Sequence, residues 1–517
     1  TGCFTLFLLF LLWLVACTAI GARAPRPRNA NAGRDVTRWG VLAFAGTSLI
    51  STFTSLSPTA STWGLGGYYG GLMLVLFTAA GYWAVRSYLD LENLDFVFWV
   101  LGITTSIVAV LYVLNIFNID LIGAYADTAV VERAQFFSTL GQKDFNGCFF
   151  SVALPIVFYQ FLNAKDTRTA VWTGIPAAFG ALALAVVDSE ALALGIGAAV
   201  MVLVCHKNFT TRHLRRAALI SAAFFGWAAW MHYMRASVYT QGGTALLAKL
   251  GAWQVALPCM AASLLLWLVL FVLARKGIAA QAPLYLPGRV ITIAVLAVGA
   301  LAFVLANAMP NRPLPESLHN LLVFNDDWGT YRGVAWRAAF GTWADGSLLR
   351  KIVGIGPGMM HTAVAAWAGD AMTARMATFY AAHNEYLEQL LTTGILGLTA
   401  WLLLVAAHLQ RGERSWNTPG VAPVMLALCS YLAQAVVSIR VSMVFPLVML
   451  LFGALAALTA PELPQPAAPA PRGKKQQKLE PLPPKNAWYF AKTVLAAVLC
   501  MAAASGIAPL LFGFLMG

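Results

Sequence analysis

The sequence contains many runs of about 18 or more mostly apolar residues, and these runs limit the possible folds more than any other feature. Each run is long enough to cross the hydrocarbon core of a bilayer as a helix. Hydrophobic residues make up 60% of the chain and charged residues only 11%, whereas soluble domains usually carry about a quarter charged residues. The chain is therefore predicted to be an all-α integral membrane protein with about 12–14 transmembrane helices.

The expected spans fall on both sides of one long polar segment. They are residues 2–21, 39–56, 69–85, 95–117, 145–163, 170–187, 191–205, 217–234, 252–274, 290–308, 384–407, 420–437, 443–459 and 489–513. No basic residue precedes the first run, so we interpret it as a spanning helix rather than a cleaved signal. The spans at 170–187 and 191–205 are short, and a helical hairpin is the alternative for this pair.

This pattern divides the chain into five parts. They are N-terminal transmembrane helices (1–308), a long loop with short helices (309–383), C-terminal transmembrane helices (384–459), a basic proline-rich linker (460–487) and a last helix (488–517).

The 34 Lys and Arg residues are distributed unevenly between the loops. If the loop 22–38 is cytoplasmic and the sides alternate, the cytoplasmic loops hold most of these cations, as the positive-inside rule requires. The long segment 309–383 is exempt from the rule by its length, and we place it outside the cytoplasm. The formal charge of +13 then reflects topology and contact with anionic membrane lipids, so we expect no nucleic-acid partner.

The long segment contains two cations that suit an anionic ligand. Arg332 and Arg337 lie in YRGVAWRAAF, whose spacing predicts a short helix near the membrane surface. An arginine side chain can donate two parallel hydrogen bonds to a phosphate group. The alternative is that these arginines pair with Asp326, Asp327 or Asp345. The glycine-rich GIGPG that follows, from Gly354, is either a structural turn or a ligand contact.

His383 is the strongest candidate for chemistry. It precedes the predicted helix 384–407, where the helix dipole disfavours a charged imidazole, so the neutral ring could act as a general base. Asn384 and Glu385 follow it directly, and Glu388 lies one turn further, although acids also favour helix starts. The alternative is a structural histidine at the membrane interface.

A second polar group precedes the span 145–163. Arg133, Lys143 and Asn146 could form another phosphate contact, and an ordinary solvated loop is the alternative. The seven cysteines are scattered without a CxxC pair, so no metal site is expected. The sequence has no glycine motif typical of nucleotide binding, so a transfer reaction would need an activated substrate.

Together these residues resemble the O-antigen ligase and O-antigen polymerase family of bacterial membrane glycosyltransferases. Three features carry the resemblance in order: STLGQKDFNG from Ser138, YRGVAW followed by GIGPGM, and HNEYLEQLLTTGILG from His383. Within the third feature, Asn384, Leu387, Gly394 and Gly397 also match the family's pattern. The resemblance extends over about residues 40–455.

The resemblance implies transfer of a glycan from an undecaprenyl-diphosphate carrier to an acceptor outside the bacterial cytoplasmic membrane, without ATP, metal ion or cofactor. It implies that His383 activates the acceptor hydroxyl and that Arg332 binds the diphosphate. The further predicted substrate-binding residues are Arg337, Arg133, Lys143, Asn384 and Glu385. The family often has an arginine where this sequence reads Asp188-Ser189-Glu190, and Arg133 and Lys143 are the candidates to replace it.

Three alternatives remain open at this stage. No motif distinguishes a ligase from a polymerase, so the acceptor is a glycan, a lipid or a protein. A lipid-carrier flippase would have charged residues inside its spans and paired half-repeats, and the predicted spans show neither. A non-catalytic partner of an envelope assembly would explain the absent arginine.

Overall fold

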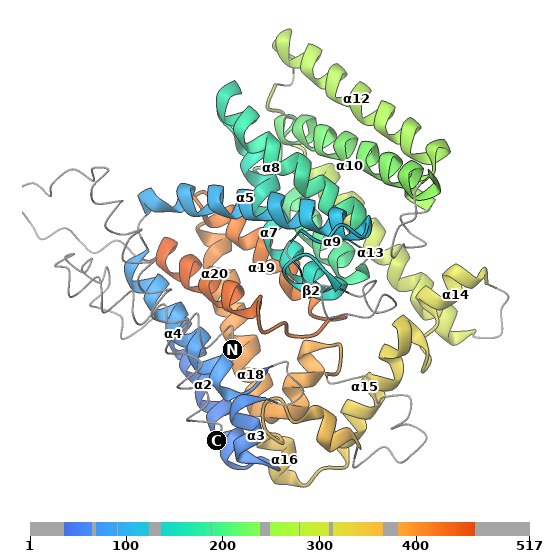
Figure 1. Cartoon of the computed structure of the whole chain (residues 1–517). Coiled ribbons are helices and arrows are strands. Elements are labelled where there is room, and N and C mark those ends of the chain that lie inside the picture. Colours follow the sequence, from blue (N-terminus) through green and yellow to red (C-terminus); the bar gives the residue numbers. More distant parts are fainter. Residues whose placement is uncertain are drawn as a thin grey trace, which may run out of the picture.

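The computed structural model describes residues 36–64, 69–89, 91–121, 123, 136–187, 189–237, 249–278, 280–309, 314–365 and 381–460. This part of the chain is mostly helical (Figure 1). One small hairpin departs from the all-helical prediction, because Phe136–Phe137 (β1) pairs antiparallel with Gly141–Gln142 (β2). The hairpin directly precedes the helix that begins at Lys143.

The long helices follow the predicted spans closely. They are α2 (Val36–Phe53), α4 (Leu72–Tyr88), α5 (Leu91–Ile116), α7 (Lys143–Asn163), α8 (Thr167–Val186), α9 (Glu190–Cys205), α10 (Thr211–Ser237), α12 (Trp253–Arg275), α13 (Tyr285–Ala308), α18 (Glu385–Arg414), α19 (Val421–Gln434) and α20 (Phe445–Leu458). Each coincides with one expected span, while the spans at 2–21 and 489–513 and the linker 460–487 lie outside the described residues except for residue 460.

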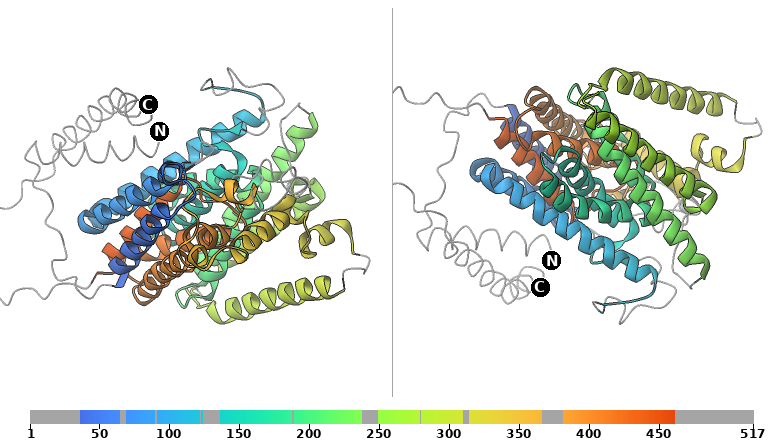
Figure 2. Two further views of the ribbon diagram at one scale, coloured as in Figure 1. Left: turned by 90° about the horizontal axis from the view of Figure 1, so that it is seen from below. Right: turned by 90° about the horizontal axis from the view of Figure 1, so that it is seen from above.

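Six of these helices, α5, α7, α8, α12, α13 and α18, are long and apolar enough to cross a membrane. They are consistent with a multi-pass membrane protein. Only 6% of the apolar window of α12 and of α13 is buried in the protein, as expected for helices that face lipid. In both views of Figure 2, the yellow-green α13 lies at the edge of the bundle, apart from the blue α2 and α5.

The core joins the two ends of the chain. α18 packs along α2, α20 along α4, and α19 along α7 and α9 (Figure 1). The fully buried ring of Trp401 on α18 lies 5.2 Å from Phe44 on α2 and 5.9 Å from Phe445 on α20 between centroids. α8 and α9 both pack on α7, so the short spans 170–187 and 191–205 are anchored by a shared neighbour.

The predicted long loop contains short helices, as expected. They are α14 (Glu316–Leu322), α15 (Trp328–Ala344) and α16 (Leu348–Val353), and a further short helix, α3 (Pro58–Trp63), lies in the loop after α2. α16 packs against α18 and α2, and α15 packs against α18. α15 and α16 therefore cover the part of the bundle near the start of α18.

Contacts between loops respect the predicted sides of the membrane. At one end, hydrogen bonds join loops predicted to be extracytoplasmic: Ser189 with Asp144, and Arg332 with Glu190. At the other end, they join loops predicted to be cytoplasmic: Arg212 with Ala164, Asn208 with Asn417, and Leu284 with Phe209. Each of these contacts joins two loops of the same predicted side, so these loops lie at a common end of the bundle, and the side of the membrane stays a prediction.

Candidate functional site

The candidate site is built around a break in α18. Gly394 has φ 68° and ψ −172°, which interrupts the helix after its first turns. Glycine adopts this backbone readily because it has no Cβ. The break separates residues 385–393 from the longer remainder of α18. We call residues 383–393 the platform, because they carry His383 at the start of this short helical piece.

The glycine-rich turn after α16 fits into this break. At a helix break, the preceding carbonyl oxygens lose their helical donors. Here the N–H groups of Ile355 and Gly356 donate to Leu391 O at 3.2 Å and Thr392 O at 2.9 Å. A Cβ on Gly354 would lie 2.2 Å from Thr392 O, so the turn needs glycine for its close approach to α18. The structural alternative for this motif therefore accounts for its glycines.

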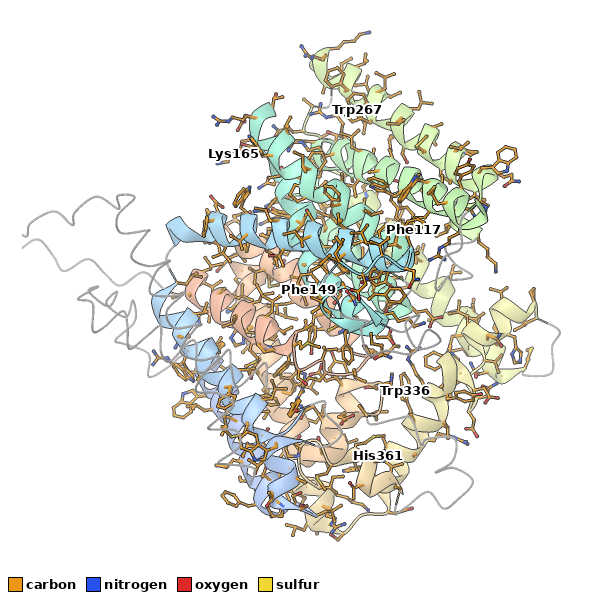
Figure 3. All side chains as sticks on the ribbon, viewed as in Figure 1. Phe117, Phe149, Lys165, Trp267, Trp336 and His361 are labelled. Atoms are coloured by element: carbon orange, nitrogen blue, oxygen red, sulfur yellow. The ribbon has the colours of Figure 1, made fainter. Side chains whose placement is uncertain are left out.

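His383 lies in a tight turn before α18. Its φ of 49° is in the left-handed region, which histidine adopts more often than most residues. Its Nδ1 lies 3.2 Å from Ala381 O. Because a carbonyl oxygen only accepts, Nδ1 carries the proton in this contact, and Nε2 carries the lone pair when the ring is neutral. Trp336 Nε1 on α15 donates to His383 O at 3.4 Å, and Figure 3 labels this tryptophan.

Burial favours the neutral imidazole. Desolvation lowers the pKa of His383 from its ordinary value, and the positive charge of Arg332 lowers it further. The Ala381 carbonyl and the Asp144 carboxylate oppose this shift, since both stabilise the protonated ring. The net result is a histidine that is neutral near pH 7 and can accept a proton.

Arg332, on α15, is the arginine that the sequence analysis expects to bind the diphosphate. Its side chain is 12% exposed and lies 3.5 Å from Glu190 Oε2, on a carboxylate side chain that is 79% exposed. Its Nη1 donates to Gly329 O at 2.8 Å, but its buried Nε has no hydrogen-bond partner among the described residues. A long ion pair with an exposed carboxylate contributes little, so Arg332 retains capacity to bind an anion.

Arg337 occupies a different environment on the same helix. It forms an ion pair with Asp326, and its side chain is 55% exposed. This is the pairing given as the alternative in the sequence analysis. A contact between Arg337 and substrate stays a prediction.

The group before the span 145–163 is mainly structural where the structure describes it. Asn146 is fully buried, accepts from Ser138 Oγ at 2.6 Å and donates to Phe137 O at 3.1 Å, so it holds the β1–β2 hairpin on α7. Lys143 is exposed at the first residue of α7. Arg133 lies outside the described residues, and the phosphate contacts predicted for Lys143 and Arg133 stay predictions.

Asn384 and Glu385 hold the start of α18. The Asn384 side chain accepts from the N–H groups of Tyr386 and Leu387 at 3.0 and 3.1 Å, which makes it the N-cap. Glu385 is 1% exposed and accepts from Tyr431 Oη and from Arg440. Both carboxylate oxygens of Glu385 therefore have partners inside the protein. The contacts predicted between substrate and Asn384 or Glu385 stay predictions.

Arg440 is a residue of this region that sequence reasoning missed. Its side chain is 13% exposed and lies against the rings of Phe44, Trp401 and Phe445. The sequence does show a lone arginine between two apolar spans. A charge in that place needs a buried partner, and this pattern could have identified Arg440 as part of the site.

The site contains no set of metal ligands within the described ranges, where no group of three or more His, Cys, Asp or Glu side chains could hold an ion. A cavity of about 190 Å³ lies at the opposite end of the bundle, where Asn163, His213 and Trp416 line it, and it shares no residue with this site. No protein-family model matches the chain, and no curated protein matches it. The geometry around His383 is therefore the basis on which a function can be inferred.

Proposed function

We propose that this protein is a membrane glycosyltransferase that moves a glycan from an undecaprenyl-diphosphate carrier to an acceptor hydroxyl on the extracytoplasmic side of a bacterial cytoplasmic membrane. The observation that carries the proposal is the electrostatic coupling of two residues: the positive charge of Arg332 helps to lower the pKa of His383, and the buried Nε of Arg332 has no hydrogen-bond partner in the described part of the chain. A base and an anion-binding group at one membrane face suit this reaction.

In the proposed reaction, the acceptor hydroxyl attacks the anomeric carbon of the donor. His383 Nε2 takes the hydroxyl proton, and the bond from the anomeric carbon to the diphosphate oxygen breaks. The lipid diphosphate leaves as an anion, which the Arg332 guanidinium stabilises. The donor is already activated by its diphosphate, so the reaction needs no nucleotide.

The position of Glu190 adds to this proposal. The family that the sequence resembles often has an arginine at this place, and Glu190 instead lies 3.5 Å from Arg332. We therefore assign Arg332 to the leaving group, because its ion pair with the exposed Glu190 is long and contributes little.

The first test is transfer by the purified protein from an undecaprenyl-diphosphate-linked donor, with a chelator present. Arg332→Ala should lower the rate by about 10²-fold or more, because the leaving group loses its charge stabilisation. Arg350→Ala is the matched control, since Arg350 is an exposed arginine on α16 in the same outer segment. Equal rates for Arg332→Ala and Arg350→Ala would contradict the proposal.

The products of the same assay separate the remaining alternatives. One glycan block on a lipid or protein acceptor indicates a ligase, and a ladder of glycan lengths on the carrier indicates a polymerase. Donor that binds without turnover, with every acceptor class supplied, would favour a flippase or a non-catalytic partner.

The pH dependence of transfer tests the electrostatic coupling of His383 to Arg332. A general base loses activity as pH falls through its pKa, and burial places the pKa of His383 below its ordinary value. Arg332→Gln removes a positive charge that lowers this pKa, so the acidic limb of the kcat/KM profile should move to higher pH. Arg350→Gln should leave the limb in place. If the acidic limb of Arg332→Gln does not move, Arg332 does not influence the pKa of the catalytic base.

A further inference from the structure

The platform is not held in place by the continuity of α18. Gly394 interrupts the helix between the platform and the apolar remainder, so the orientation of His383 must depend on contacts with other elements. Residues 355 and 356 supply two of these contacts through their N–H groups. Ser51 of α2 supplies another, because its hydroxyl donates to Thr392 O at 2.5 Å.

Arg440 makes the charged contact with the platform. Its Nε and Nη2 donate to Glu385 Oε1 at 2.9 and 2.6 Å. With its amide oxygen turned toward Arg440, Gln389 accepts from Nη1 at 2.6 Å and donates to Thr393 Oγ1 at 2.8 Å. Glu385 and Gln389 lie one turn apart on the same face, so Arg440 binds the short helical piece through two side chains.

The guanidinium itself is fixed from the other side. Its central carbon lies 4.5 Å from the ring of Phe445 on α20, 5.6 Å from Phe44 on α2 and 5.7 Å from Trp401 on α18. Rings at these distances attract a cation and exclude water from it. The Glu385 N–H also donates to Ala435 O at 2.8 Å, so both the backbone and the side chain of Glu385 are tied to the segment that carries Arg440.

We propose that Arg440 is a positioning residue for His383: it orients the platform through Glu385 and Gln389 and thereby sets where Nε2 meets the acceptor. The role of Nε2 toward the acceptor rests on the proposed function. The positioning of His383 by Arg440 does not depend on that function. Arg440 touches neither substrate nor His383 in this account and acts through the platform.

The test uses the double variant Glu385→Gln/Arg440→Met, which removes both buried charges together. Loss of Arg440 alone would leave the Glu385 carboxylate buried without its cation and could unfold the protein, whereas removal of both charges is often tolerated. Two properties are measured: kcat and KM for transfer, and the rate at which diethyl pyrocarbonate modifies His383, followed by peptide mass spectrometry. Only the first depends on the proposed function.

We expect the double variant to remain monodisperse, with kcat reduced about 10- to 100-fold, KM for the donor nearly unchanged and the modification rate of His383 altered severalfold. Arg216→Met is the matched control, since Arg216 is a partly buried arginine at the opposite end of the bundle that donates to Phe161 O and Leu162 O. It should leave both measurements at their wild-type values.

The outcomes separate the two proposals. Wild-type kcat and wild-type modification in the double variant would overturn the positioning role. Altered modification of His383, together with full activity of a His383 variant, would keep the positioning role and overturn the proposed function. If the double variant does not fold, Arg440→Lys is measured in the same way, because lysine keeps the charge but cannot bind Glu385 and Gln389 with a planar fork.

Discussion

His383→Asn is expected to reduce kcat for glycan transfer by about 10²- to 10⁴-fold, the usual contribution of a general base. Asparagine suits the test because it tolerates the left-handed backbone at which His383 has φ 49°. The turn before α18 should therefore persist while the basic nitrogen is lost. Rates are measured with saturating donor and acceptor, and circular dichroism and thermal unfolding confirm that the variant is folded.

His319→Asn is the control for this experiment. His319 lies on α14, in the same outer segment, and no step of the proposed reaction uses it. Its replacement should leave kcat unchanged. A folded His383→Asn protein with wild-type kcat would show that the histidine takes no part in the chemistry, whatever the effect of Arg332.

Gly354→Ala is expected to cause the largest loss of stability among the single changes considered, more than about 2 kcal/mol. At φ 83° a Cβ strains the backbone, and the new atom would lie 2.2 Å from Thr392 O, which is backbone and cannot rotate away. The turn would have to withdraw from the break in α18, so Leu391 O would lose the Ile355 N–H and Thr392 O would lose the Gly356 N–H. Thermal unfolding in detergent measures the loss.

Gly299→Ala provides the comparison. Gly299 lies within α13, where a Cβ would meet nothing within 4 Å, and alanine favours a helix by up to about 1 kcal/mol. This variant should unfold at or slightly above the wild-type temperature. Equal thermal stability of the Gly354 and Gly299 variants would mean that the turn does not need its glycine.

The helices were predictable because a backbone in lipid must form its hydrogen bonds within its own segment. Apolar runs such as 252–274 and 290–308 must be helical to satisfy their own N–H and C=O groups, and α12 and α13 follow them within a few residues. The β1–β2 hairpin was not predicted, since two residues per strand give no alternating pattern to detect. Its stability depends on Asn146, whose tertiary contacts the sequence does not display.

The site was predictable only in part. The sequence singled out His383 and Arg332, and the structure describes both, whereas their roles in chemistry stay predictions. Glu385 looked similar, yet it is buried against Arg440, more than fifty residues later in the chain. Nothing in the local sequence of either residue shows that pairing, because it arises from the crossing of α18 with the segment between α19 and α20.

The break at Gly394 also constrains how the chain is assembled. Synthesis delivers residues 354–356 before α18, so the turn must wait for a helix that is made later. Until the two meet, Leu391 O lacks its donor from Ile355, and Thr392 O has only the Ser51 hydroxyl of α2 as a donor. The native position of the turn therefore depends on a helix that is completed only after the turn itself has been made.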